Sequence, residues 1–133
     1  MKSKSRRNRR RAITARPARK MSEMVWEFAG EFIRLGETLA HRQIRLNAAV
    51  SAWNLACLPP EARPRAMDEY ITSCKSHNPR VTDEQLSDIR GDMEKLVGNK
   101  LSLFPAINKP IVGARISRVG GRDRIDVASV RVE

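Results

Sequence analysis

The cysteine and histidine residues are the first candidates for chemistry in this sequence, because thiolates and imidazoles bind zinc. Cys74 and His77 form a Cys-x-x-His pair, and His41 and Cys57 are the two side chains that could complete a set of four ligands. These two lie 16 residues apart, and neither belongs to a second closely spaced pair. We therefore expect two half-buried thiols on two helices and no metal site.

Three carboxylates, Glu84, Asp88 and Asp92, follow one another at intervals of four residues. On a helix this spacing places them on one face, where they could hold a divalent cation. The same spacing is typical of the solvated face of an amphipathic helix, and we adopt that interpretation.

Sequence motifs of enzymes are missing as well. The chain has no glycine-rich phosphate loop, nucleophile elbow, zinc-protease motif or dinucleotide fingerprint. His41 and His77 have no acid-base partner that the sequence identifies. The sequence thus predicts a non-catalytic protein without a cofactor.

The densest group of charged side chains lies at the start of the chain. Residues 1–20 contain ten Lys and Arg and no acid, whereas residues 21–133 contain 16 basic and 15 acidic residues, so this arm accounts for nearly all of the net charge of +11. Guanidinium groups bind phosphate oxygens in pairs and release counterions from nucleic acid of any sequence. The predicted nucleic-acid-binding residues are Arg6, Arg7, Arg9, Arg10, Arg11, Arg16, Arg19 and Lys20.

Several origins of this arm remain open at the level of sequence. Its few apolar residues predict disorder in the absence of a partner. No apolar segment follows the basic stretch, so a secretory signal is not expected, while an organellar transit peptide is compositionally allowed. The arm could also be a solvated tail, or an extension from a misplaced start, because Met21 opens a chain of balanced charge. Two cysteines are too few for a disulfide framework and favour the reducing cytoplasm.

The residues from Met24 to Cys57 are expected to be helical. Large apolar side chains recur there at alternating steps of three and four, which places them in one stripe of a helix. Either one long helix runs through, or two helices meet near Gly36 and Thr38 caps the second. We favour the continuous helix.

A second, thinner apolar stripe lies roughly opposite the first. Such a helix has to be covered on two sides, as the central helix of the core or as a surface shared with another subunit. The stripe consists of Trp26, Ile33, Ala40, Ile44, Ala48 and Leu55, and the candidate interface residues are Trp26, Ile33, Ile44 and Leu55.

The remaining segments predict shorter elements. Pro59 and Pro60 end the long helical segment, a helix follows over about 61–76, and Thr82 with Gln85 resembles a capping box at the start of a helix over 82–104. Val-rich and Ile-rich segments at 111–119 and 124–132 flank Gly120-Gly121 and predict a β-hairpin within about 110–132. A lone hairpin is marginal in water, so it should dock on the helices or pair with another strand.

Membrane association is not expected. No apolar run reaches about 18 residues. The polar face of the first helical segment carries Glu23, Glu27, Glu31 and Glu37, which anionic lipid would repel.

These features together predict an α+β chain, with a disordered basic arm (1–20) in front of one domain (21–133) of three or four helices and a C-terminal hairpin. The predicted function is sequence-nonspecific binding of nucleic acid through the arm. RNA or a ribonucleoprotein is favoured over a specific DNA site, because no helix-turn-helix with a basic recognition helix is present. The alternative is an interaction or oligomerisation module that uses helix 24–57 and the hairpin edge to bind a second copy or another protein.

Overall fold

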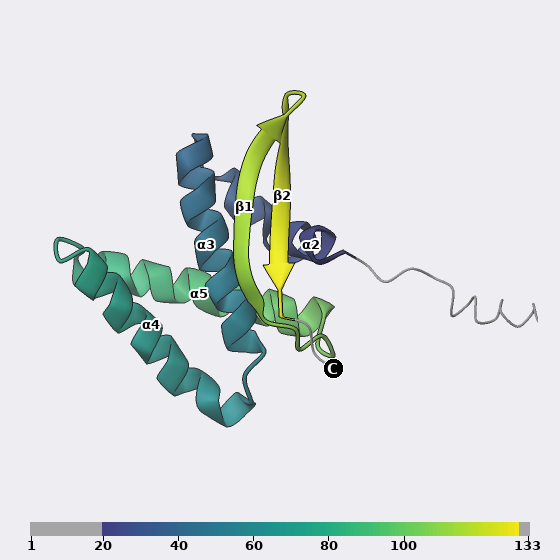
Figure 1. Cartoon of the computed structure of the whole chain (residues 1–133). Coiled ribbons are helices and arrows are strands. Elements are labelled where there is room, and N and C mark those ends of the chain that lie inside the picture. The colour runs from purple at the N-terminus through teal and green to yellow at the C-terminus, as the bar shows by residue number, and fades with distance from the viewer. Residues whose placement is uncertain (1–19, 131–133) are drawn as a thin grey trace, which may run out of the picture.

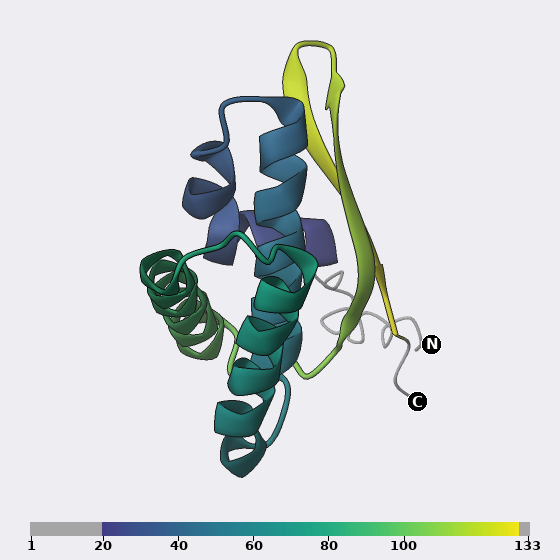
Figure 2. The same ribbon diagram turned by 90° about the vertical axis from the view of Figure 1, so that its left-hand side faces the viewer.

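Helices and a hairpin form two layers in the structure, a computed structural model that describes residues 20–130. All the helices lie on one face of the hairpin, with α3 along β1 and α2 near β2 (Figure 1 and Figure 2). This arrangement confirms the predicted α+β class. The elements in chain order are α2 (Met21–Arg34), α3 (Leu39–Ala56), the 3-10 helix η1 (Pro60–Ala62), α4 (Arg63–His77), α5 (Asp83–Leu103), β1 (Ile111–Val119) and β2 (Arg122–Ser129).

The first apolar stripe belongs to two helices, so the predicted continuous helix is wrong and the alternative start at Thr38 is confirmed. α2 ends at Arg34, and the Thr38 hydroxyl accepts a hydrogen bond from the His41 N–H at 3.1 Å. Gly36 lies in the bend between the helices, where a Cβ would be 2.7 Å from the backbone nitrogen of Arg42. Arg42 Nε in turn donates to the Gly36 carbonyl at 2.8 Å. The Arg42 side chain therefore holds the bend closed.

Prolines and a capping box set the limits of α4 and α5. Pro60 opens η1, and α4 begins at Arg63, two residues after the predicted start. The Thr82 hydroxyl accepts from the Gln85 N–H at 3.1 Å, and the Gln85 side chain accepts from the Thr82 N–H at 2.9 Å. The predicted capping box of the α5 N-terminus is thus confirmed.

The hairpin closes through a two-residue turn. Gly120 and Gly121 have φ angles of 59° and 78°, which side chains with a Cβ rarely adopt and which a type I′ turn requires. The strands pair antiparallel, with Val119 opposite Arg122. β2 begins at Arg122, two residues earlier than predicted, because the turn uses only the glycines.

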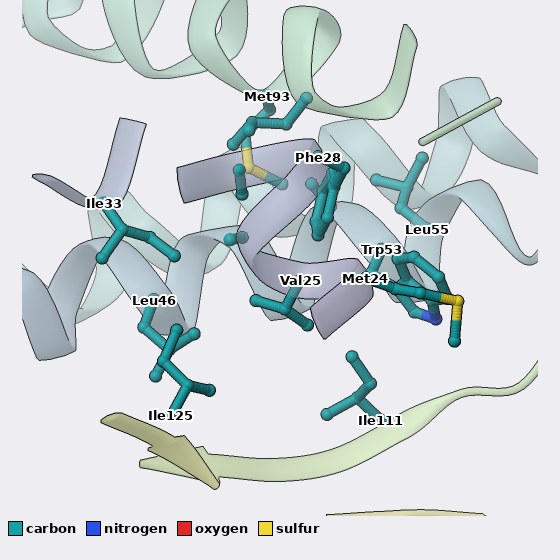
Figure 3. Packing of buried hydrophobic residues seen from close by; sticks show 14 of the residues in the cluster. Met24, Val25, Phe28, Ile33, Leu46, Trp53, Leu55, Met93, Ile111 and Ile125 are labelled. Carbon is teal, nitrogen blue, oxygen red and sulfur yellow. The ribbon is translucent and has the colours of Figure 1, made fainter. Parts of the chain in front are cut away.

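Trp53 of α3 lies at the centre of the core and has no exposed surface. Its ring centroid is 5.4 Å from that of Phe28 in α2 and 6.0 Å from that of Phe104 after α5. Ile111 and Ile125 point from the hairpin toward the helices (Figure 3). The aromatic cluster thus joins three segments that are far apart in the sequence.

Lys100 is a buried cation beside this tryptophan. Its side chain has no exposed surface, its Nζ lies 5.0 Å from the Trp53 ring centroid, and it donates a hydrogen bond to the Ile107 carbonyl. Burial lowers the pKa of Lys100 and raises the pKa of the nearby Cys57 thiol. Trp53 Nε1 donates to the Lys109 carbonyl at 2.9 Å. Trp53 and Lys100 therefore fasten the segment between α5 and β1.

Two amide side chains of α3 bind the backbone of β1 as a neighbouring strand would. Asn54 donates to the Ile111 carbonyl at 2.8 Å and accepts from the Ile111 N–H at 2.7 Å. Gln43 donates to the Ala114 carbonyl at 3.1 Å and accepts from the Ile116 N–H at 2.9 Å. The two amides are 11 residues apart, about three helical turns, and so lie on one face of α3.

A pair of substitutions tests which residues of the second apolar stripe belong to the core. Ile33 has no exposed surface, whereas the Ile44 side chain is 64 % exposed. Ile33→Asp buries an unpaired carboxylate and should lower the free energy of unfolding by more than about 4 kcal/mol. Ile44→Asp should change it by no more than about 0.5 kcal/mol. Urea unfolding followed by circular dichroism measures both values, and equal losses would contradict the assignment.

A second prediction concerns the amide at position 54. Asn54→Ala leaves the buried N–H and C=O of Ile111 without partners, which should cost about 1–3 kcal/mol of stability. Asn108→Ala is the matched control, since that asparagine is exposed in the segment before β1. A loss for Asn54→Ala no larger than that of the control would show that the amide does not hold β1.

Candidate functional site

The structure places one of the predicted nucleic-acid-binding residues. Lys20 is exposed and is the N-cap residue of α2. The other predicted contacts lie outside residues 20–130: Arg6, Arg7, Arg9, Arg10, Arg11, Arg16 and Arg19. The described part of the chain therefore shows where the arm joins the domain.

The four candidate interface residues do not share one surface. Ile33 and Leu55 are 0 % and 7 % exposed and belong to the core, whereas the interface prediction expected them on a surface. Side chains of one helix differ in exposure, since Ile44 and Leu55 both belong to α3 and are 64 % and 7 % exposed. Trp26 is half-buried beneath the Arg34 guanidinium, 4.8 Å from the ring centroid, and Ile44 is exposed.

A groove lies where the arm joins the domain, between the start of α2 and the edge of β2, with a volume of about 750 Å³. We call it the arm-root groove. The N-terminal turn of α2 forms one wall, and five consecutive residues of β2 form the other. The lining residues are Lys20, Met21, Ser22, Trp26, Lys109, Asp123, Arg124, Ile125, Asp126 and Val127.

The acidic groups of the arm-root groove are already paired. Asp123 lies 3.1 Å from Arg42 and 3.6 Å from Arg118, and the Asp126 carboxylate is 3.1 Å from Arg124 Nε. Lys20 and Lys109 form no ion pair within residues 20–130. Two ammonium groups are thus free to meet an anion beside the first residue of the described chain.

Similarity to known proteins does not contribute to the assignment. No family model, curated protein or solved structure matches this chain. None of the helices within residues 20–130 combines the length and the apolar composition that spanning a membrane requires.

The outer face of the hairpin continues the basic surface of the groove. Arg115, Arg122 and Arg124 are exposed or half-exposed on it, and no helix covers this face within the described chain (Figure 2). Asp126 lies opposite Arg115 in the ladder and is the acidic residue of this face. Basic side chains therefore outnumber acidic ones on the outer face.

A second hollow, the α3–α5 cleft, lies between α3, α4 and α5 and has a volume of about 580 Å³. The sequence does not indicate this cleft, because the spacing of apolar residues does not show at what angle α4 leaves α3. The cleft is mainly apolar. Its apolar lining includes Phe32, Ile44, Ala48, Tyr70, Cys74, Ile89 and Met93.

The potential zinc ligands are divided between separate places. Cys57 Sγ lies 3.9 Å from the Ile107 carbonyl oxygen in the segment between α5 and β1, whereas Cys74 and His77 line the α3–α5 cleft. His77 Nδ1 lies 2.9 Å from the Ser73 carbonyl oxygen and 3.4 Å from the Ser73 hydroxyl. Nowhere in residues 20–130 do three His, Cys, Asp or Glu side chains gather to hold a metal ion. Glu84, Asp88 and Asp92 lie along α5.

The ionisation of Tyr70 reports on the closure of the α3–α5 cleft. Burial, together with the Cys74 thiol, raises the pKa of Tyr70 from 10.0 to about 12. The folded state retains the Tyr70 proton at a pH at which the unfolded state loses it. The free energy of unfolding therefore decreases as the pH rises from 10.0 to about 12. Tyr70 is the single tyrosine, so tyrosinate absorbance titrates it alone. We expect a native midpoint near 12 that returns toward 10.0 in concentrated urea; a native midpoint of 10.0 would mean that the cleft is open to water.

Proposed function

We propose that the protein is a non-catalytic, sequence-nonspecific nucleic-acid-binding protein that acts on RNA or a ribonucleoprotein in the cytoplasm. The observation on which this depends is the separation of charge. Residues 1–20 contain ten basic residues and no acid, and the rest of the chain is almost neutral. An arm of this composition binds phosphate through counterion release and needs no particular base sequence.

The arm-root groove supports the proposal by its charges. Lys20 begins the described chain beside Lys109, while Arg42 and Arg124 pair with the two aspartates of the groove. A phosphate backbone that follows the arm to Lys20 therefore meets further cations. Arg115 and Arg122 extend this surface along the hairpin.

The position of the aromatic side chains supports binding to the backbone without reading of bases. Single-stranded RNA is read by stacking bases on exposed aromatic rings of a sheet or groove. Here Phe28, Trp53 and Phe104 are buried, Trp26 of the arm-root groove has the Arg34 guanidinium over its ring, and the described strands contain no aromatic residue. The long helix α5 has an acidic exposed face, unlike a helix that enters the major groove.

The proposal predicts the effect of removing arm charges on the salt dependence of binding. In the full chain, Arg9→Ala, Arg10→Ala and Arg11→Ala together should weaken binding to a structured RNA and to duplex DNA by similar factors. If all three contact phosphate, the slope of log K against log salt becomes shallower by about 3 for duplex DNA. Fluorescence-anisotropy titration at several salt concentrations measures both quantities.

The matched control removes the same charge from the helices. Arg65, Arg80 and Lys95 are exposed on or beside α4 and α5, and their combined replacement by Ala should leave the affinity and the slope nearly unchanged. Equal losses in the two triple variants would mean that overall charge is responsible and the arm is not. Loss of binding to one sequence alone would contradict nonspecific phosphate contact.

A further inference from the structure

The two edges of the hairpin are treated differently by the rest of the chain. On the β1 edge, Gln43 and Asn54 occupy outward-facing backbone groups of Ile111, Ala114 and Ile116. No strand lies beside β2 on the side away from β1 within the described chain (Figure 1). The hairpin is thus closed along one edge and open along the other.

The register identifies the free backbone groups of β2. Val119 and Arg122 flank the two-residue turn and form a hydrogen-bonded pair, and such pairs alternate along an antiparallel ladder. Asp123, Ile125 and Val127 therefore direct their N–H and C=O groups away from β1. Within residues 20–130, none of these six groups forms a hydrogen bond. Unpaired edges of this kind are templates for another strand.

We propose that β2 pairs antiparallel with β2 of a second copy, about a two-fold axis at Ile125, so that the two hairpins form one four-stranded sheet. In this register Ile125 faces Ile125 of the second copy, and Asp123 faces Val127. The free groups of both copies then pair with one another across the axis. On the outer face, Arg124 of each copy lies opposite Asp126 of the other.

The charges of β2 select this register among the neighbouring two-fold alternatives. An axis at residue 124 would place two Arg124 side chains opposite each other, and an axis at residue 126 would oppose two Asp126 side chains. Like charges in directly opposed positions destabilise a sheet, whereas opposite charges stabilise it. The axis at Ile125 instead places Arg124 of each copy opposite Asp126 of the other, which forms two symmetric ion pairs.

The arm-root groove supplies room and contact surface for the second strand. Met21 and Trp26 of α2 line the groove beside the β2 edge and are half-buried, so apolar surface is available there. Ile125 is buried on the helical face of its own hairpin, and the axis brings the two Ile125 side chains together on that face. The proposal uses none of residues 1–19, but it places the second strand in the arm-root groove and pairs Arg124 with Asp126 of the second copy, so the dimer is tested in the absence of nucleic acid.

The test uses the full chain, treated with nuclease, in sedimentation-equilibrium experiments over a range of concentrations. The wild-type protein should form a dimer of twice 15.1 kDa. In a dimer of the Arg124→Asp variant, the aspartate at position 124 of each copy faces Asp126 of the other. In a dimer of the Asp126→Arg variant, the arginine at position 126 of each copy faces Arg124 of the other. Each variant alone should dimerise about tenfold more weakly or worse.

Mixing the two variants is the decisive measurement. In a one-to-one heterodimer, the aspartate introduced at position 124 faces the arginine introduced at position 126, and the unchanged Asp126 of the first variant faces the unchanged Arg124 of the second. Both ion pairs are restored, so the mixture should regain the wild-type dimer affinity. A change in the stability of either monomer cannot produce this recovery. Arg80→Asp and Asp88→Arg make the same charge changes away from β2 and should leave dimerisation unchanged.

Three outcomes would overturn the proposal. A wild-type chain that remains at 15.1 kDa up to its highest soluble concentration has no such dimer. Two single variants that dimerise as tightly as the wild type place the interface elsewhere. Failure of the mixture to recover, with both variants folded by circular dichroism, excludes the Ile125 register.

Discussion

The hydrogen bonds between the amides of α3 and the backbone of β1 are the constraint on which the rest of the arrangement depends. A two-stranded ribbon leaves polar backbone groups on both edges, and burying such groups without partners is costly. Asn54 and Gln43 satisfy those of β1 at two points along α3. The direction of α3 thereby sets the direction of the hairpin, and the isoleucines of both strands face the core.

The segment from Phe104 to Pro110 has no regular structure of its own, yet it determines where the hairpin begins. Lys100 binds its Ile107 carbonyl, and Trp53 binds its Lys109 carbonyl. Both donors come from helices that pack together, so the segment is held by the core. The lowered pKa of Lys100 is the electrostatic consequence of placing a cation there.

The sequence was sufficient to predict elements whose limits are local. The capping box at Thr82 and the paired glycines of the turn act over a few residues, and both lie where the sequence placed them. The bend at Gly36 was misjudged because the apolar stripe stays in phase across it, whereas the contact between Arg42 and the Gly36 carbonyl depends on the folded chain.

The candidate site was harder to predict, for the same physical reason. The composition of residues 1–20 indicated a phosphate-binding arm, but the proximity of Lys20 to Arg124 arises from packing between the first and last elements. Ile33 and Leu55 had the spacing of a second helical face, yet both are buried in the core cluster that the helices and the hairpin form together. Periodicity shows which side chains share a face of one helix; it does not show which neighbour covers that face.

The small buried surface of α4 affects the order in which the helices unfold. Within α4, described throughout, Met67 alone is buried, whereas α2 and α3 each bury six residues. Elements with little buried surface exchange their amide hydrogens by local unfolding, at a lower free energy than the global transition. Of the three helices around the α3–α5 cleft, α4 can therefore unfold locally while α3 and α5 remain folded. Access to the interior of the cleft is thus governed by the local stability of α4.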